Sequence, residues 1–175
     1  MTDKPHERAG LSGSLRAADG KGIVHIEACL EVAIEEVWSA LSDPKQLGRW
    51  LGAFEGDLRA GGAFRARFFA SEWEGSGFVE VCNPPQRVLV RMTEAGATDL
   101  STMEVTLDAD GQQTQLVVEQ RGVPLDQLAA YGAGAQVHVE DLASHLAGRE
   151  RCDARARWGE LFPSYRSKPI DPAWH

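Results

Sequence analysis

VWSALSDPKQLGRW, residues 37–50, sets the topology of this chain, because it predicts two short helices joined at an angle. Asp43 is a favourable N-cap and Pro44 suits the first position of a helix, so a second helix begins there. The apolar residues before this junction recur with the i, i+3, i+4, i+7 spacing of one helix face: Ile34, Val37, Trp38 and Leu41. A first strand is expected at 22–30, immediately before the helix pair.

Alternation of apolar and polar residues follows, from Phe54 to Gln120, and predicts an antiparallel meander. Gly61-Gly62 and Asn83-Pro84-Pro85 mark turns, since neither proline can donate to a strand ladder. With residues 22–30 this makes about seven strands. A long helix then shows one apolar stripe, formed by Ala135, Val139, Leu142 and Leu146. We therefore expect an α+β protein in which a curved antiparallel sheet wraps around a long C-terminal helix, the helix-grip fold.

Three regions are expected along the chain. Residues 1–20 are rich in Gly and polar side chains and predict a flexible lead, residues 21–149 form the domain, and 150–175 are a C-terminal extension. The sequence of the extension predicts a short helix over Cys152–Phe162 and an extended tail from Pro163. Met1–Gly10 has no apolar segment of the kind that signal peptides carry, so a cytoplasmic location is expected.

Composition excludes several classes of function. The 175 residues carry a net charge of −8, which argues against binding to nucleic acid or to anionic membranes. Cys29, Cys82 and Cys152 fit no disulfide framework or CxxC site and predict reduced thiols. The sequence has no stretch of 18 apolar residues and no Walker, GxGxxG, GxSxG or HExxH motif, so we expect no membrane span, cofactor or metal.

Several phrases, taken in order, resemble one known family. They are VWSALSDP with Leu47 and Arg49-Trp50, GGAFR at 61–65, NPPQRV at 83–88 and LASHLAG at 142–148. Together they resemble the Bet v 1/START-like (SRPBCC) superfamily, and within it the Hsp90-ATPase-activator-homologue (AHSA1-like) branch. The sequence departs from that branch at Met92 and at Gln136-Val137, where tryptophan is frequent in the family.

The resemblance implies a cavity between the concave sheet and the last helix, where members of the superfamily bind lipids, polyketides and other apolar molecules. We therefore expect a small apolar ligand, with Trp50 at the mouth as the strongest single candidate. Each inward-facing candidate could equally be ordinary packed core, because pockets and cores have similar composition. The candidate ligand-binding residues are Trp50, Phe64, Phe68, Val90, Met92, Met103, Val105, Val118, His138, Val139 and Leu142.

Two other functions remain open, although binding is favoured over an enzymatic role. The first is a cyclase, dehydratase or hydrolase acting in the cavity, and no catalytic residue is assigned to it. The second is an Hsp90-type co-chaperone or protein-interaction module, for which the sequence itself offers no support. The aromatic residues of the extension could form its surface, cover the cavity or form a homodimer seam: Trp158, Phe162, Tyr165 and Trp174.

A few titratable residues are candidates for catalysis or metal binding. His138, Asp141 and His145 share one flank of the last helix, but His138 and His145 are two turns apart, so they do not form a zinc pair. His138 and Asp141 could form an acid–base dyad, or could lie on a solvated helix flank. Glu72 and Glu74 read as loop residues. Arg65, Arg67 and Arg91 alternate with apolar residues and are expected on the outer face.

Overall fold

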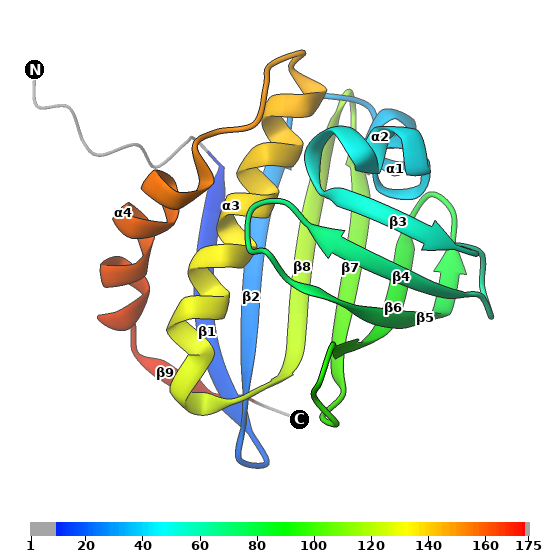
Figure 1. The fold of residues 1–175 in the computed structure, drawn as a ribbon. Coiled ribbons are helices and arrows are strands. Elements are labelled where there is room, and N and C mark those ends of the chain that lie inside the picture. The colour runs from blue at the N-terminus through cyan, green and yellow to red at the C-terminus, as the bar shows by residue number, and fades with distance from the viewer. Residues whose placement is uncertain (1–9, 174–175) are drawn as a thin grey trace, which may run out of the picture.

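The computed structural model describes residues 10–173, which form one open nine-stranded sheet and four α-helices (Figure 1). The strands are β1 Leu11–Ala18, β2 Lys21–Leu30, β3 Gly52–Gly56, β4 Ala63–Phe68, β5 Glu74–Asn83, β6 Arg87–Glu94, β7 Ser101–Asp110, β8 Gln113–Val123 and β9 Ile170–Pro172. The helices are α1 Ile34–Ser42, α2 Pro44–Trp50, α3 Leu128–Leu146 and α4 Ala154–Arg166, with a 3-10 turn at Leu125–Gln127.

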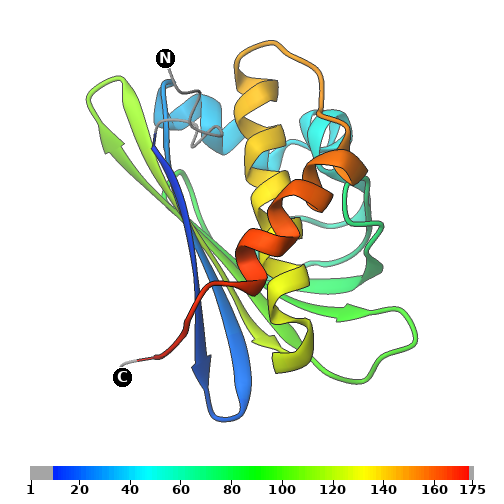
Figure 2. The same cartoon turned by 90° about the vertical axis from the view of Figure 1, so that its left-hand side faces the viewer.

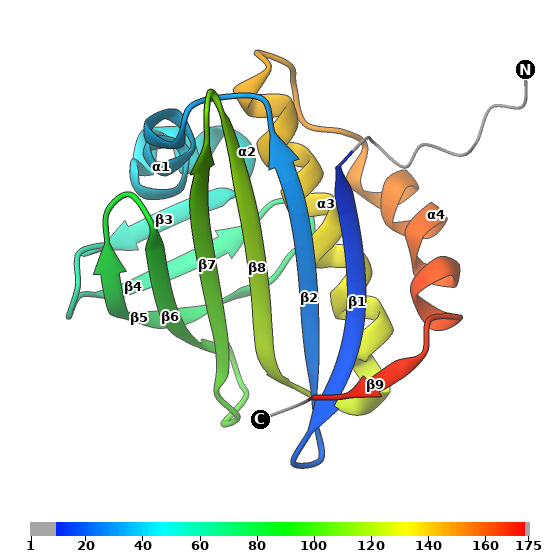
Figure 3. The ribbon, with the colours of Figure 1, turned by 180° about the vertical axis from the view of Figure 1, so that it is seen from behind.

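The sheet has the strand order β3-β4-β5-β6-β7-β8-β2-β1-β9. Its neighbouring strands are antiparallel except for β1 and β9, which run parallel. The sheet curves so that α3 lies along its concave side, while the convex side is free of helices (Figures 1 and 3). The expected α+β helix-grip architecture is thus confirmed. The expected number of strands, about seven, was too low for the part of the chain that is described.

The two additional strands lie outside the range where strands were expected. β1 occupies Leu11–Ala18 of the predicted flexible lead and forms a hairpin with β2 across Asp19-Gly20, where both residues have positive φ, 53° and 77°. Gly13 within the strand, with Gly10 and Gly20 near its ends, made this segment resemble a loop. Gly13 is required because a Cβ at that position would overlap the hydroxyl of Tyr165. A contact with a residue 152 positions further along the chain leaves no local signal in the sequence.

The helix pair is as the sequence predicts. Asp43 accepts a hydrogen bond from the Lys45 amide at 3.0 Å, and Pro44 is the first residue of α2. Leu47 and Trp50 turn inward and are buried. The two helices close one end of the space between the sheet and α3 (Figure 1).

The C-terminal part differs from expectation at two points. α3 begins at Leu128 and runs through Gly132 and Gly134, although two glycines this close together favour a bend. α4 continues through Pro163, where an extended tail was expected. Tyr165 of α4 joins these two segments. It is 1% exposed, packs on Gly132 and donates a 2.7 Å hydrogen bond to Gln136 Oε1, so its burial holds α4 against α3 (Figure 2).

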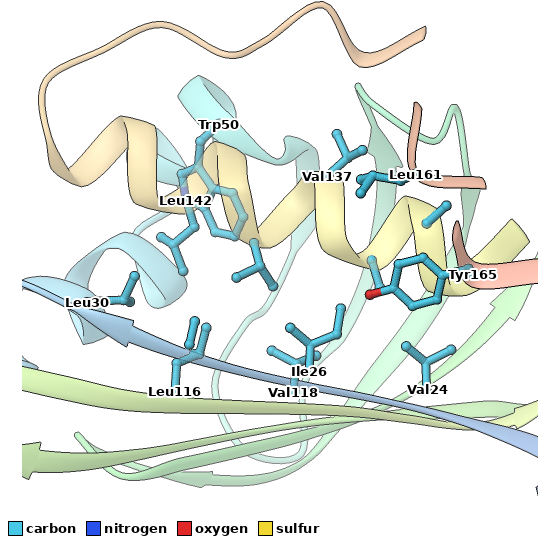
Figure 4. Packing of buried hydrophobic residues seen from close by; sticks show 14 of the residues in the cluster. Val24, Ile26, Leu30, Trp50, Leu116, Val118, Val137, Leu142, Leu161 and Tyr165 are labelled. Carbon is cyan, nitrogen blue, oxygen red and sulfur yellow. The ribbon is translucent and has the colours of Figure 1, made fainter. Parts of the chain in front are cut away.

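The main core lies between α3 and only half of the sheet. Val24, Ile26 and Leu116 on β2 and β8 meet Val137 and Leu142 on α3 (Figure 4). A second apolar cluster lies on the far strands and is formed by Phe64, Ala66, Phe68, Trp73, Val79 and Met92. Between these two clusters the sheet curves away from α3. Within residues 10–173, no helix is both long and apolar enough to cross a membrane.

The close approach of Tyr165 to α3 predicts opposite effects for two neighbouring glycines. At Gly132 an added Cβ would lie 2.6 Å from the tyrosine ring, whereas at Gly134 its nearest neighbour is Ser71 Cβ at 3.9 Å. We expect Gly134→Ala to raise the free energy of unfolding by about 0.5–1 kcal/mol, since alanine favours a helix over glycine. Gly132→Ala should lower it by about 1–3 kcal/mol through overpacking. Urea unfolding of both variants tests this, and a gain in stability for Gly132→Ala would contradict the packing described.

Candidate functional site

A cavity of about 840 Å³ lies where the sheet separates from α3. Its walls are the inner faces of β4–β8, one face of α3 and the helix pair α1–α2, and the first turn of α4 completes the rim. Most of its side chains are apolar. Exposed residues such as Ser71 and Glu94 stand at its edges, so the cavity communicates with solvent.

Every candidate ligand-binding residue from the sequence lines this one cavity. Strand alternation explains this for the candidates on β4 and β6–β8, whose side chains point to the concave face of the sheet. Arg65, Arg67 and Arg91 are exposed on the outer face, as expected, and Arg91 pairs there with Glu80 at 2.7 Å. Of the positions where the sequence departs from the resembled family, Met92 lines the cavity, but Val137 packs in the main core.

One wall of the cavity is aromatic. Phe54 on β3 lies 5.8 Å from Phe64 and 6.0 Å from Phe68, measured between ring centroids. Phe68 in turn lies 5.0 Å from Trp73, which is 9% exposed. Gly77 on the neighbouring strand leaves room for the Phe64 ring, which a Cβ there would overlap. This wall offers flat, polarisable surfaces to an aromatic guest.

Trp50 combines the two roles that the sequence suggested. It lines the cavity and belongs to the same buried cluster as Leu142 of α3 (Figure 4). Its indole Nε1 also donates a 2.9 Å hydrogen bond to the Ala40 carbonyl, which ties α2 to α1. The tryptophan therefore fixes the helix pair as well as forming part of the wall.

His138 is the histidine of α3 that reaches the cavity. Its Nε2 lies 3.1 Å from Ser71 Oγ, and its ring meets the Phe68 ring edge-on at 5.3 Å. The Nδ1 atom is buried without a hydrogen-bond partner among the described residues. Burial lowers the pKa of His138 to about 4, so the ring is uncharged at neutral pH.

His138 and Asp141 do not form a dyad, and Asp141 does not lie on a solvated flank. Asp141 is 1% exposed, and its Oδ1 accepts a 3.0 Å hydrogen bond from the Cys152 amide. Burial raises the pKa of this carboxyl group. His145 lies 3.0 Å from Gln46 Oε1 and does not line the cavity. Asp141 and His145 thus hold the chain around α3 together, and neither belongs to the site.

The beginning of α4 forms part of the cavity rim. Asp153 caps the helix by accepting a 3.1 Å hydrogen bond from the Ala156 amide. Trp158 donates to the Ala130 carbonyl at 3.2 Å and stacks on Phe162 with 4.5 Å between ring centroids. Both Trp158 and Ala130 line the cavity. The extension therefore covers one side of the opening, whereas Trp174 lies outside the described residues.

The sequence analysis did not name many of the lining residues, and three of these bear on the chemistry of the site. Trp73 stood between two glutamates in an apparent loop, and Tyr131 preceded the expected start of the helix. Gln120 is 6% exposed on the inner face of β8, and its spacing of two and four residues from Val118 and Leu116 was a usable signal. No cluster of His, Cys, Asp or Glu within residues 10–173 could hold a metal ion. The site thus offers apolar burial and a few hydrogen-bonding groups.

Comparison with known proteins gives a consistent classification. The family model described as Activator of Hsp90 ATPase homolog 1-like protein matches residues 31–147. CalU16 from Micromonospora echinospora is 23% identical, with a TM-score of 0.73 over 90% of this chain and 95% of its own. A Bordetella parapertussis protein is 20% identical, with a TM-score of 0.70 over 91% of this chain and 92% of its own. At these identities, the two similarities show a shared fold and nothing more.

A third solved structure is DynU16, from the dynemicin biosynthetic locus. It is 26% identical with a TM-score of 0.69, and the match covers 78% of this chain but 51% of DynU16. This chain therefore spans about half the length of that relative. No curated protein matches the sequence.

The enclosed position of His138 makes a pH prediction. The folded protein holds its pKa at about 4, whereas the ordinary value is 6.5. Between these two pH values the unfolded chain binds a proton at this site and the folded chain does not, so acidification through this range favours unfolding. His138→Gln should therefore show a smaller loss of unfolding free energy than wild type as the pH is lowered from 6.5 to 4. An NMR titration that placed the pKa of His138 near 6.5 in the folded protein would contradict the burial described.

Proposed function

The chain belongs to the Activator of Hsp90 ATPase homolog 1-like family, whose model matches more than half of it, and we propose that it binds a small apolar molecule in the cavity under α3. The cavity itself is the observation that supports this function. Its volume of about 840 Å³ lies in the range of small-molecule sites, and its wall is apolar with few polar groups.

Burial of apolar surface would drive binding. A guest that loses about 300 Å² of apolar surface gains roughly 7 kcal/mol at 25 cal/mol per Å². Association and ordering cost at least about 4 kcal/mol, so apolar contact alone leaves modest affinity. The aromatic wall adds ring contacts, and the polar groups in the cavity would set orientation. Such a site holds its guest by shape and burial without a covalent step.

The structural relatives support a small organic guest without specifying it. DynU16 comes from a biosynthetic locus, and its structure shares the fold of this chain. A polyketide-like or aromatic compound would suit the phenylalanine and tryptophan wall better than a saturated chain, because flat rings stack on such surfaces.

A hydrolase acting in the same cavity is the second candidate, and one contact favours it. His138 Nε2 lies 3.1 Å from Ser71 Oγ, the distance of a serine and its general base. A histidine with a pKa of about 4 is, however, a weak base for a serine hydroxyl. Its Nδ1 also lacks the orienting partner of a triad within the described chain. Binding therefore has the stronger support.

A protein-interaction role finds less support in α4. Tyr165, one of the aromatic residues considered for such a surface, is 1% exposed and serves the core. Trp158 stacks on Phe162 beside the cavity. Self-association through the extension stays a prediction, to be checked by the molar mass in solution.

Filling the cavity should abolish binding. Nile red, a neutral apolar dye, is expected to bind at one site with increased fluorescence. Met103→Trp places a large side chain in the cavity from β7 and should weaken dye binding by about tenfold or more. The matched control is Thr102→Trp, which adds the same side chain to the outer face of the same strand. Equal dye binding by wild type and Met103→Trp would show that the dye does not use the cavity.

A further inference from the structure

The mostly apolar lining of the cavity includes a glutamine on β8. Gln120 is on the inner face of β8, in line with Leu116 and Val118, and is 6% exposed. Its backbone pairs with Met103 of β7, which also lines the cavity. The strand ladder therefore fixes the direction of its side chain toward the space below α3.

Among the described residues, the Gln120 amide has no hydrogen-bond partner. No hydrogen bond joins its side chain to another residue of the described range 10–173. Two other inward polar groups are satisfied: Thr114 on the same strand donates to the Val32 carbonyl at 2.8 Å, and Trp50 donates to the Ala40 carbonyl. The Nδ1 atom of His138, on the facing helix, is another lining atom without a partner among the described residues. The polar atoms of the Gln120 side chain are not among the fully buried, unpaired atoms of the described residues, so they face accessible space, which here is the cavity. Its donor and acceptor are thus available to a molecule in the cavity.

The charges around the cavity restrict the guest. The lining includes three acidic side chains, Glu72, Glu94 and Asp153, and one positively charged side chain, Arg155. Glu94 ends β6 at the end of the sheet where β8 leads into α3 (Figure 1). There, burial and the charge of Glu94 raise the pKa of Tyr131, another lining residue. An excess of negative charge disfavours an anionic guest.

We propose that Gln120 is the hydrogen-bonding anchor of the site, and that the guest is a neutral aromatic molecule carrying a carbonyl or hydroxyl group. The ring system packs against the aromatic wall of Phe54, Phe64, Phe68 and Trp73, and the polar group forms a hydrogen bond with the amide of Gln120. Free carboxylic acids, such as fatty acids, are disfavoured. This inference rests on the proposed function and adds the chemical class of the ligand.

Competition against Nile red tests the anchor with three probes of similar shape. They are the ketone 2-acetylnaphthalene, the hydrocarbon 2-isopropylnaphthalene and the anion 2-naphthoate. Their inhibition constants are measured for wild type, for Gln120→Met, which keeps the side-chain length, and for Gln115→Met. The last is the matched control, because Gln115 lies on the outer face of the same strand.

The ratio of ketone affinity to hydrocarbon affinity should fall about three- to tenfold in Gln120→Met, the worth of one hydrogen bond. It should stay unchanged in Gln115→Met, and wild type should bind naphthoate more weakly than the ketone. Thermal unfolding shows whether Gln120→Met is folded, and Gln120→Leu takes its place if it is not.

Each contrary result has a separate meaning. If dye and probes bind but the ratio is the same in wild type and Gln120→Met, the anchor is wrong and the binding function stands. If wild type prefers naphthoate to the ketone, the neutral class is wrong. If wild type does not bind Nile red at all, the proposed function fails and this inference fails with it.

Discussion

The packing of α3 against only half of the sheet is the constraint on which the rest of the structure depends. Apolar residues of β1, β2 and β8 meet the buried face of α3 and form one continuous core. The remaining strands carry their own apolar cluster on β4–β6 and curve away from the helix. Since one straight helix cannot cover the whole concave face of a strongly curved sheet, part of the apolar face is not covered by α3. The cavity is therefore a consequence of how the core is built.

The position of α3 is itself held from outside by α4. Glu140 on α3 is 3% exposed and accepts hydrogen bonds from Arg157 at 2.7 and 2.8 Å. This contact raises the pKa of the Arg157 guanidinium, so the pair stays ionised. Tyr165 fills the gap that Gly13 and Gly132 leave on β1 and α3. The extension thus serves two purposes, because its first turn borders the cavity while its last turn belongs to the core.

Local signals in the sequence predicted the parts that depend on neighbouring residues. The Asp43-Pro44 junction, the alternation in β4 and β6–β8, and the inward side of the strands all follow from capping and periodicity. Long-range contacts were not predictable, and β1, the early start of α3 and the helical Pro163 were missed. Tyr165 makes two such contacts, with Gly13 of β1 and Gly132 of α3. The existence of a cavity came from family resemblance, because apolar walls and apolar cores have the same composition. Gln120 was overlooked for a related reason, since a glutamine in a strand is usually expected to face solvent. Only its even spacing from Leu116 and Val118 shows that it faces inward.

The central claim is that the space under α3 holds a neutral aromatic guest through burial and the Gln120 amide. A crystal structure of the protein with 2-acetylnaphthalene tests it most directly. The account predicts the naphthalene ring between α3 and the aromatic wall, with its carbonyl oxygen within about 3.2 Å of the Gln120 amide nitrogen. A guest bound only on the outer surface, with Gln120 packed against protein and the cavity closed, would contradict it.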